Sequence, residues 1–81
     1  MHVDILTPEQ TVFSGEADSV SFPGMAGHFQ VLNNHAPIIA ALKPGTIKVK
    51  TNKEESRYEI KSGVVEVLKN KVTVLVEGVN K

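Results

Sequence analysis

The sequence predicts an all-β fold, a small antiparallel β-sandwich of about eight to ten short strands. Val and Ile supply 17 of the 81 residues, and their branched side chains fit a pleated sheet better than a helix. Polar and apolar residues alternate in short segments, and Gly, Pro or Asn separates these segments at intervals of about 8–12 residues. No window shows the 3.6-residue repeat of an amphipathic helix, so we expect no helix and a single domain spanning residues 1–81.

The expected strands lie between turn residues. In the first half they cover residues 3–6, 11–14, 17–22 and 28–32, separated by Thr7-Pro8, Ser14-Gly15, a wide loop around Pro23-Gly24, and Asn33-Asn34. In the second half they cover 38–42, 46–51, 56–61, 64–68 and 71–77, separated by Pro44-Gly45, Asn52-Lys53, Ser62-Gly63 and Asn70. The alternation is clearest in residues 46–50, where Ile47 and Val49 share one face and Lys48 and Lys50 the other.

Composition excludes several classes of function. The absence of Cys excludes disulfides, thiolate zinc sites and thiol nucleophiles. No apolar run approaches the roughly 20 residues of a membrane-spanning helix, and the first residues lack the pattern of a signal peptide. A net charge of zero and a single Tyr do not fit a nucleic-acid-binding surface.

The charges are unevenly distributed along the chain. Residues 1–42 contain four acidic and no basic residues, whereas residues 43–81 contain nine basic and five acidic ones. In a sandwich the two halves interleave, so we expect much of this difference to cancel in space. We interpret the segment before Lys43 as a contact surface that is free of long, flexible cations.

Catalytic or metal-binding candidates are few. His28 and His35 are seven residues apart, and Asp18 or Glu16 could add a carboxylate, but this spacing matches no known metal motif. A nucleophile would have to come from Ser14, Ser19 or Ser21, which alternate along strands as solvent-facing residues do. A stand-alone hydrolase or metal-binding module using His28 and His35 is therefore the alternative hypothesis, and we expect a protein without catalysis or a cofactor.

Two segments are unusually apolar. Met25, Ala26 and Phe29 surround the tip of the expected loop, where they either form a contact surface or pack back onto the core. Residues 36–42 lack any polar side chain, so both faces of that strand are apolar. This strand is either buried at a closed seam or covered on its outer face by another protein.

The basic residues of the second half are interleaved with acidic ones. They include Lys48, Lys50, Lys53, Arg57, Lys61, Lys69 and Lys71. Because Glu54, Glu55, Glu59 and Glu66 lie among them, we expect cross-strand ion pairs on a solvated face rather than a polyanion-binding site.

A series of motifs identifies a family resemblance. In chain order they are Leu6-Thr7-Pro8-Glu9, Val12-Phe13-Ser14-Gly15, Pro23-Gly24-x-x-Gly27-x-Phe29, Asn34-His35-Ala36-Pro37, Leu42-Lys43-Pro44-Gly45 and Ser62-Gly63-Val64-Val65. Over nearly the whole chain they resemble the N-terminal β-sandwich domain of the epsilon subunit of F-type rotary ATP synthases, called delta in mitochondria.

The resemblance implies a non-catalytic, proton-coupled rotor subunit that joins the gamma subunit to the c-ring during ATP synthesis. It implies a c-ring contact by Met25, Ala26, Gly27, His28 and Phe29. It implies a gamma contact by Thr7, His35, Ala36, Pro37 and Ala40. The expected location is the cytoplasmic face of the bacterial inner membrane, reached only indirectly through the c-ring, with no nucleic-acid partner and no small-molecule substrate.

The sequence departs from the family pattern in three respects. His28 stands where the family usually has an acidic residue, Gln30 replaces a common glycine, and Ser62 replaces the first of a usual glycine pair. Many members also continue into a C-terminal helical hairpin that can bind ATP or slow hydrolysis. We expect this chain to be a natural short form without that hairpin.

Overall fold

The computed structural model describes residues 1–52 and 54–80 and confirms the all-β prediction. Its nine strands are β1 (His2–Leu6), β2 (Thr11–Glu16), β3 (Ser19–Gly24), β4 (Gly27–Leu32), β5 (Ile38–Leu42), β6 (Gly45–Lys50), β7 (Glu55–Ile60), β8 (Ser62–Leu68) and β9 (Lys71–Glu77). No helix occurs in the described ranges. Each strand boundary lies within two residues of its expected position.

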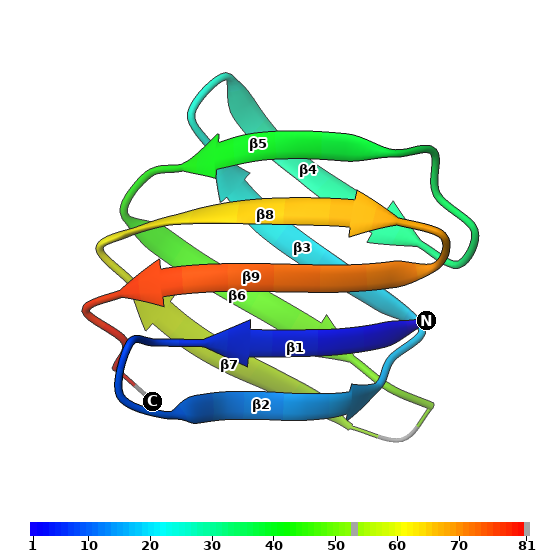
Figure 1. Cartoon of the computed structure of the whole chain (residues 1–81), viewed down its shortest axis with the longest axis horizontal. Helices are drawn as coiled ribbons and strands as arrows, with labels where there is room; N and C mark the ends of the chain where they lie inside the picture. The colour runs from blue at the N-terminus through cyan, green and yellow to red at the C-terminus, as the bar shows by residue number, and fades with distance from the viewer. Residues whose placement is uncertain (53, 81) are drawn as a thin grey trace.

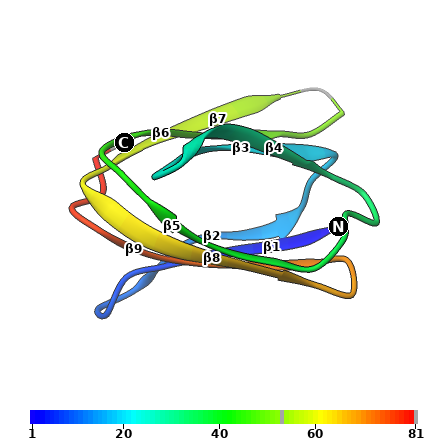
Figure 2. The same ribbon diagram turned by 90° about the horizontal axis from the view of Figure 1, so that it is seen from above.

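The strands form two layers that face each other across the core (Figures 1 and 2). The first layer has the strand order β2-β1-β9-β8-β5, and the second has the order β4-β3-β6-β7. Between the strands of the two layers there is one bridged pair, Gly24 of β3 with Leu42 of β5. The sheet curls at this point, which brings the β3–β4 turn beside the end of β5.

Strand direction differs from the expectation at one place. All pairings between the described strands are antiparallel except β1 with β9, which is parallel from His2 opposite Lys71 to Leu6 opposite Leu75. The antiparallel prediction is therefore wrong for this pair. Consecutive strands joined by short turns must run antiparallel, but β1 and β9 come from opposite ends of the chain, so no hairpin constrains their relative direction.

The core consists of side chains that point inward from both layers. Phe22, Ile5 and Ile47 are its largest fully buried members. The Phe22 ring packs against Phe29 with a centroid distance of 5.3 Å. On the opposite side of the sandwich, Phe13 of β2 packs against Tyr58 of β7 at 6.3 Å. Burial of this apolar surface holds the two layers together.

Four glycines expected in turns, at positions 15, 24, 45 and 63, lie inside strands instead, and Gly24 and Gly63 show the reason. The wide loop expected around Pro23-Gly24 is a two-residue turn at Met25-Ala26, because β3 extends through Gly24. A Cβ at Gly24 would lie 2.5 Å from the carbonyl oxygen of Gly27. Gly63 belongs to β8, and a Cβ there would lie 2.8 Å from the carbonyl oxygen of Leu75. Both glycines permit close strand packing rather than a turn.

Candidate functional site: the outer face of the first layer and the β3–β4 turn

The β3–β4 turn projects from the edge of the sandwich. Met25 at its tip is 65% exposed, and Ala26, Gly27 and His28 are also exposed. Met25 and Ala26 keep negative φ, and Gly27 adopts a φ of 137° that turns the chain into β4. Phe29 differs from the other four, because its ring points inward and packs on Phe22. The two alternatives for this segment therefore apply to different residues. Met25 is exposed, as a contact surface requires, whereas Phe29 packs back onto the core.

The residues expected to contact gamma do not form one cluster. His35, Ala36 and Pro37 lie in the connection before β5, whereas Thr7 lies beyond the end of β1 at the other end of the layer (Figure 1). Ala40 is half-buried and packs against the core. Its neighbours Ile39 and Ala41 point outward instead. The structure thus places Ala40 beneath the outer surface rather than on it.

Part of the outer face of the first layer is apolar, where a two-layer sandwich ordinarily has polar side chains. We call this surface the apolar face, and its members are Leu6, Ile39, Ala41, Val64, Leu68 and Leu75. Ile39 is 73% exposed and Leu75 is 57% exposed. The alternative in which the 36–42 strand is buried at a closed seam is therefore wrong.

Four members of the apolar face form a continuous row. Ala41 lies opposite Val64, Val64 opposite Leu75, and Leu75 opposite Leu6, so the row crosses four neighbouring strands. A hollow of about 560 Å³ lies along this row, and Met25 of the β3–β4 turn also lines it. The exposed turn and the apolar face are therefore parts of one surface.

Val64, Leu75 and Leu6 were not expected as site residues. Each lies at an outward position of a strand whose buried positions are valine or isoleucine. The sequence feature that could have identified them is an apolar residue at a strand position where the alternation predicts a polar one. The sequence does not show that the three lie side by side, because β1 and β9 pair across almost the whole length of the chain.

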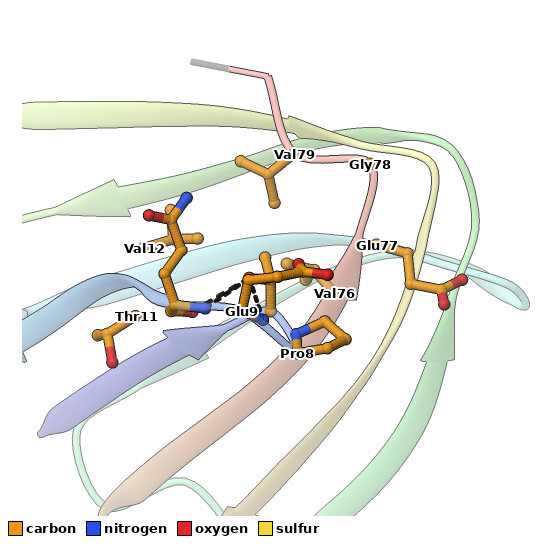
Figure 3. Close-up of a pocket in the computed structure, with 10 residues that line it drawn as sticks. Pro8, Glu9, Thr11, Val12, Val76, Glu77, Gly78 and Val79 are labelled. Carbon is orange, nitrogen blue, oxygen red and sulfur yellow. Dashed lines mark hydrogen bonds between the residues drawn. The ribbon is translucent and has the colours of Figure 1, made fainter.

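Thr7 has a structural role in the β1–β2 turn. Its hydroxyl donates to the carbonyl oxygen of Gln10 at 3.2 Å and accepts from the N–H groups of Glu9 and Gln10. Beside this turn is a second hollow of about 550 Å³ between the turn and the segment after β9 (Figure 3). Because the hydroxyl is engaged within the turn, the Thr7 methyl group is the part left for a contact.

The other end of the same face is polar. His2 faces two carboxylates, with its Nε2 3.1 Å from Asp4 Oδ1 and its Nδ1 3.3 Å from Glu16 Oε2. Ser14 Oγ donates to Asp4 Oδ1 at 2.6 Å, and this bond, followed by the contact with His2, holds the pKa of Asp4 below its ordinary value. The face therefore changes from apolar to charged along the strands.

The histidines of the alternative hypothesis are not brought together. His28 lies near the start of β4 and His35 lies beyond its end. His28 and Leu32 are four residue steps apart along the extended strand, which corresponds to about 13 Å. His35 Nδ1 also lies 2.6 Å from the Ala36 carbonyl oxygen. Among residues 1–52 and 54–80, no group of three or more His, Asp or Glu side chains could hold a metal ion.

The nucleophile candidates are also separate from the histidines. Ser14 donates to Asp4, and Ser19 is buried at 7% exposure, contrary to the expectation that the serines face solvent. No hydrogen bond in the described chain joins a serine to a histidine. The arrangement offers an extended contact surface rather than a nucleophile and base.

Charged side chains cover the outer face of β6 and β7 in the second layer. Lys50 lies opposite Glu55 but forms no ion pair with it, and Lys48 lies opposite Arg57, so the predicted cross-strand ion pairs are absent at these positions. Arg57 Nε instead donates to Glu55 Oε2 on its own strand at 2.8 Å, which lowers the pKa of Glu55. Lys53, which belongs to the same predicted cluster, lies outside the described residues. The face is charged and mixed in sign.

The comparison with known families agrees with this fold. The profile of the β-sandwich domain of the ATP synthase delta/epsilon chain matches residues 1–81. The chain belongs to this family. The ATP synthase epsilon chain of Rhodopseudomonas palustris (strain BisA53) is 41% identical over 76 residues, which cover 94% of this chain and 56% of that protein. The ATP synthase epsilon chain of Chlorobium limicola is 43% identical over 79 residues, which cover 96% of this chain and 90% of that protein.

Two solved structures contain a chain with the same fold. A chain in the central stalk and c-ring structure of the Tetrahymena thermophila mitochondrial ATP synthase superimposes with a TM-score of 0.83 and 17% identity, covering 99% of this chain and 65% of that one. A chain of the Euglena gracilis mitochondrial ATP synthase superimposes with a TM-score of 0.89 and 17% identity, covering 96% of this chain and 51% of that one. This chain spans about half the length of the Rhodopseudomonas relative. Its described residues include no helix long and apolar enough to cross a membrane.

Proposed function

We propose that this epsilon-type domain is a non-catalytic rotor part of an F-type, proton-translocating ATP synthase, where it couples the gamma subunit to the c-ring. Membership of the delta/epsilon family supports the assignment to an ATP synthase. The structurally similar chains come from ATP synthase structures that include the central stalk or the c-ring. In this proposal the domain belongs to a membrane-associated complex, and in a bacterium it lies on the cytoplasmic side of the membrane. The domain contacts the membrane only through the c-ring.

The observation that carries the proposal is the apolar face. Large exposed apolar patches on a monomeric domain mark interaction sites, and Ile39, Val64 and Leu75 form such a patch on a rigid sheet. Gamma docks on this face in our proposal, with Thr7 at one end and Pro37 at the other. The inward-pointing Ala40 supports the face from below.

The c-ring contact is assigned to the β3–β4 turn. Met25, Ala26, Gly27 and His28 are exposed there and free to meet a polar loop, while Phe29 anchors the turn to the core. Two partners together can supply the roughly 1,000 Å² or more that a specific interface needs. Because Met25 also lines the hollow beside the apolar face, the two contacts adjoin each other.

The gamma contact is tested by co-purification with separately tagged gamma. The double variant Val64→Ser and Leu75→Ser removes apolar surface from the face without disturbing inward side chains, and we expect it to lose gamma. The matched control Lys48→Ser and Arg57→Ser changes two opposed residues on the second layer and should retain gamma. Retention of gamma by the first variant, or its loss by the control alone, would refute the assignment.

The c-ring contact is tested in reconstituted ATP synthase. Ala26→Arg places a bulky cation at the exposed turn, so we expect ATP-driven proton pumping to fall while gamma stays bound. Full pumping in the Ala26→Arg enzyme would place the c-ring contact elsewhere on the domain.

A further inference from the structure

The β3–β4 turn is fixed to the end of β5 by backbone hydrogen bonds. The Met25 N–H donates to the Ala41 carbonyl oxygen at 2.9 Å, and the Lys43 N–H donates to the Pro23 carbonyl oxygen at 2.9 Å. The bridged pair that joins β3 to β5 lies between these two bonds. The backbone therefore holds Met25 beside Ala41, which belongs to the row of the apolar face.

Two hollows meet at Met25. The first is the hollow of about 560 Å³ along the apolar row. The second has a volume of about 490 Å³ and lies between the turn and β5, where residues 24–29 and 38–41 line it. Met25 and Ala41 are the two residues that line both hollows. Because Ala41 is small, Met25 is the one large side chain that the two hollows share.

The second hollow is apolar like the first. Phe29, Ile38 and Ile39 line it, and His28 is the only polar side chain among its lining residues. A polar loop docked here would lose hydrogen bonds to water and find few side-chain partners in exchange, which is unfavourable. Apolar side chains of a partner would instead bury apolar surface on both sides. The two hollows therefore fit one continuous apolar surface of a single partner.

We infer that the Met25 side chain belongs to the docking surface for gamma rather than to the c-ring contact, and that gamma places an apolar side chain on each side of it. The inference rests on the proposed function, because it extends the surface that gamma covers onto the β3–β4 turn. Ala26, Gly27 and His28 remain for the c-ring. Methionine suits this position, since its unbranched, polarisable side chain adapts to the groups packed against it.

Methyl NMR tests this contact directly. The chain contains two methionines, so labelling with [methyl-¹³C]Met gives two signals. Met25 is 65% exposed, whereas Met1 is 6% exposed in the core and serves as the internal control. When unlabelled gamma is added without the c-ring, we expect the Met25 signal to shift or broaden and the Met1 signal to stay in place.

The two ways in which this test can fail are distinguishable, because the backbone amides of the apolar face are recorded in the same titration. An unchanged Met25 methyl signal, together with amide changes at Val64 and Leu75, would overturn the inference and leave the proposed function standing. No response to gamma at any of the three residues would refute the proposed function and the inference with it.

Affinity measurements with gamma alone provide the second test. We expect Met25→Ser to weaken binding about tenfold and Met25→Leu, which remains apolar and of similar size, to stay within about threefold. The matched control Leu32→Ser removes another exposed apolar side chain, 54% exposed on β4, and should leave the affinity unchanged. Because the c-ring is absent, a loss in Met25→Ser cannot come from the c-ring contact. Equal affinities for Met25→Ser and Leu32→Ser would overturn the inference.

Discussion

Val64 and Leu75 lie directly opposite each other on β8 and β9, and both side chains point into solvent, 47% and 57% exposed. A cross-strand apolar pair contributes about 0.2–1 kcal/mol. When the domain is alone, this pair leaves about half of its surface in water. A partner that covers the pair would bury that remaining surface, which is the basis of the proposed gamma contact.

The isolated domain should therefore tolerate a polar residue at this position. We expect Leu75→Thr to change the free energy of unfolding by no more than about 1 kcal/mol. The matched substitution Val74→Ala, one residue earlier at a fully buried position, should cost about 2 kcal/mol because it leaves a cavity. Urea unfolding of the two variants measures both values, and a larger loss in Leu75→Thr would mean that this side chain serves the fold.

Gly24 should be far less replaceable than Gly15. A Cβ at Gly24 would meet the Gly27 carbonyl oxygen at 2.5 Å and the Phe29 ring at 2.9 Å, whereas at Gly15 the nearest atom, on Phe13, is 3.6 Å away. We expect Gly24→Ala to destabilise the domain by about 2 kcal/mol or more and Gly15→Ala to stay within about 1 kcal/mol. Similar melting temperatures for the two variants would contradict the close packing under the β3–β4 turn.

The β8–β9 turn offers a stabilising substitution. Lys69 and Asn70 both have positive φ, 51° and 61°, as in a type I′ turn, in which Asn is preferred over Lys at the first position. We expect Lys69→Asn to raise the free energy of unfolding by about 0.5 kcal/mol. As a control, Lys71→Asn lies on the extended β9 strand and should give no gain. Destabilisation by Lys69→Asn in chemical denaturation would contradict this.

Ser14 should control the titration of Asp4. The hydroxyl bond of Ser14 is the main cause that lowers the Asp4 pKa below its ordinary value of 3.8, with His2 contributing less. A lowered folded-state pKa stabilises the fold above the unfolded value, and this stability is lost as the pH falls through the folded value. In Ser14→Ala the pKa should move up towards 3.8. Carboxyl ¹³C NMR measures it, and an unchanged midpoint would show that the bond is unimportant.

Much of the fold could be predicted because each strand shows its own local alternation. In residues 71–77 valine occupies every second position, and the structure places Val72, Val74 and Val76 in the core as expected. The parallel β1–β9 pair could not be predicted, because it depends on which distant strands become neighbours. Gly24 was assigned to a loop because a glycine needed for close packing looks the same in sequence as a glycine needed for a turn.

The candidate site was predicted only in part for the same reason. The exposed turn at Met25 and the two-sided apolar segment 36–42 were both visible as local anomalies. Which side of that segment faces outward depends on its register with β8, and this register exposes Ile39 and Ala41 rather than Ala40. Val64 and Leu75 join the surface only through pairings across the layer.

NMR mapping of gamma binding tests the docking proposal most directly. Unlabelled gamma is added to the ¹⁵N-labelled domain, and changes in the amide signals are assigned to residues. We predict that the largest changes fall on the outward residues Ile39, Ala41, Val64 and Leu75, with little change at Lys48 and Arg57 on the second layer. The largest changes at Lys48 and Arg57, with the apolar face unaffected, would contradict the proposed docking of gamma on the first layer.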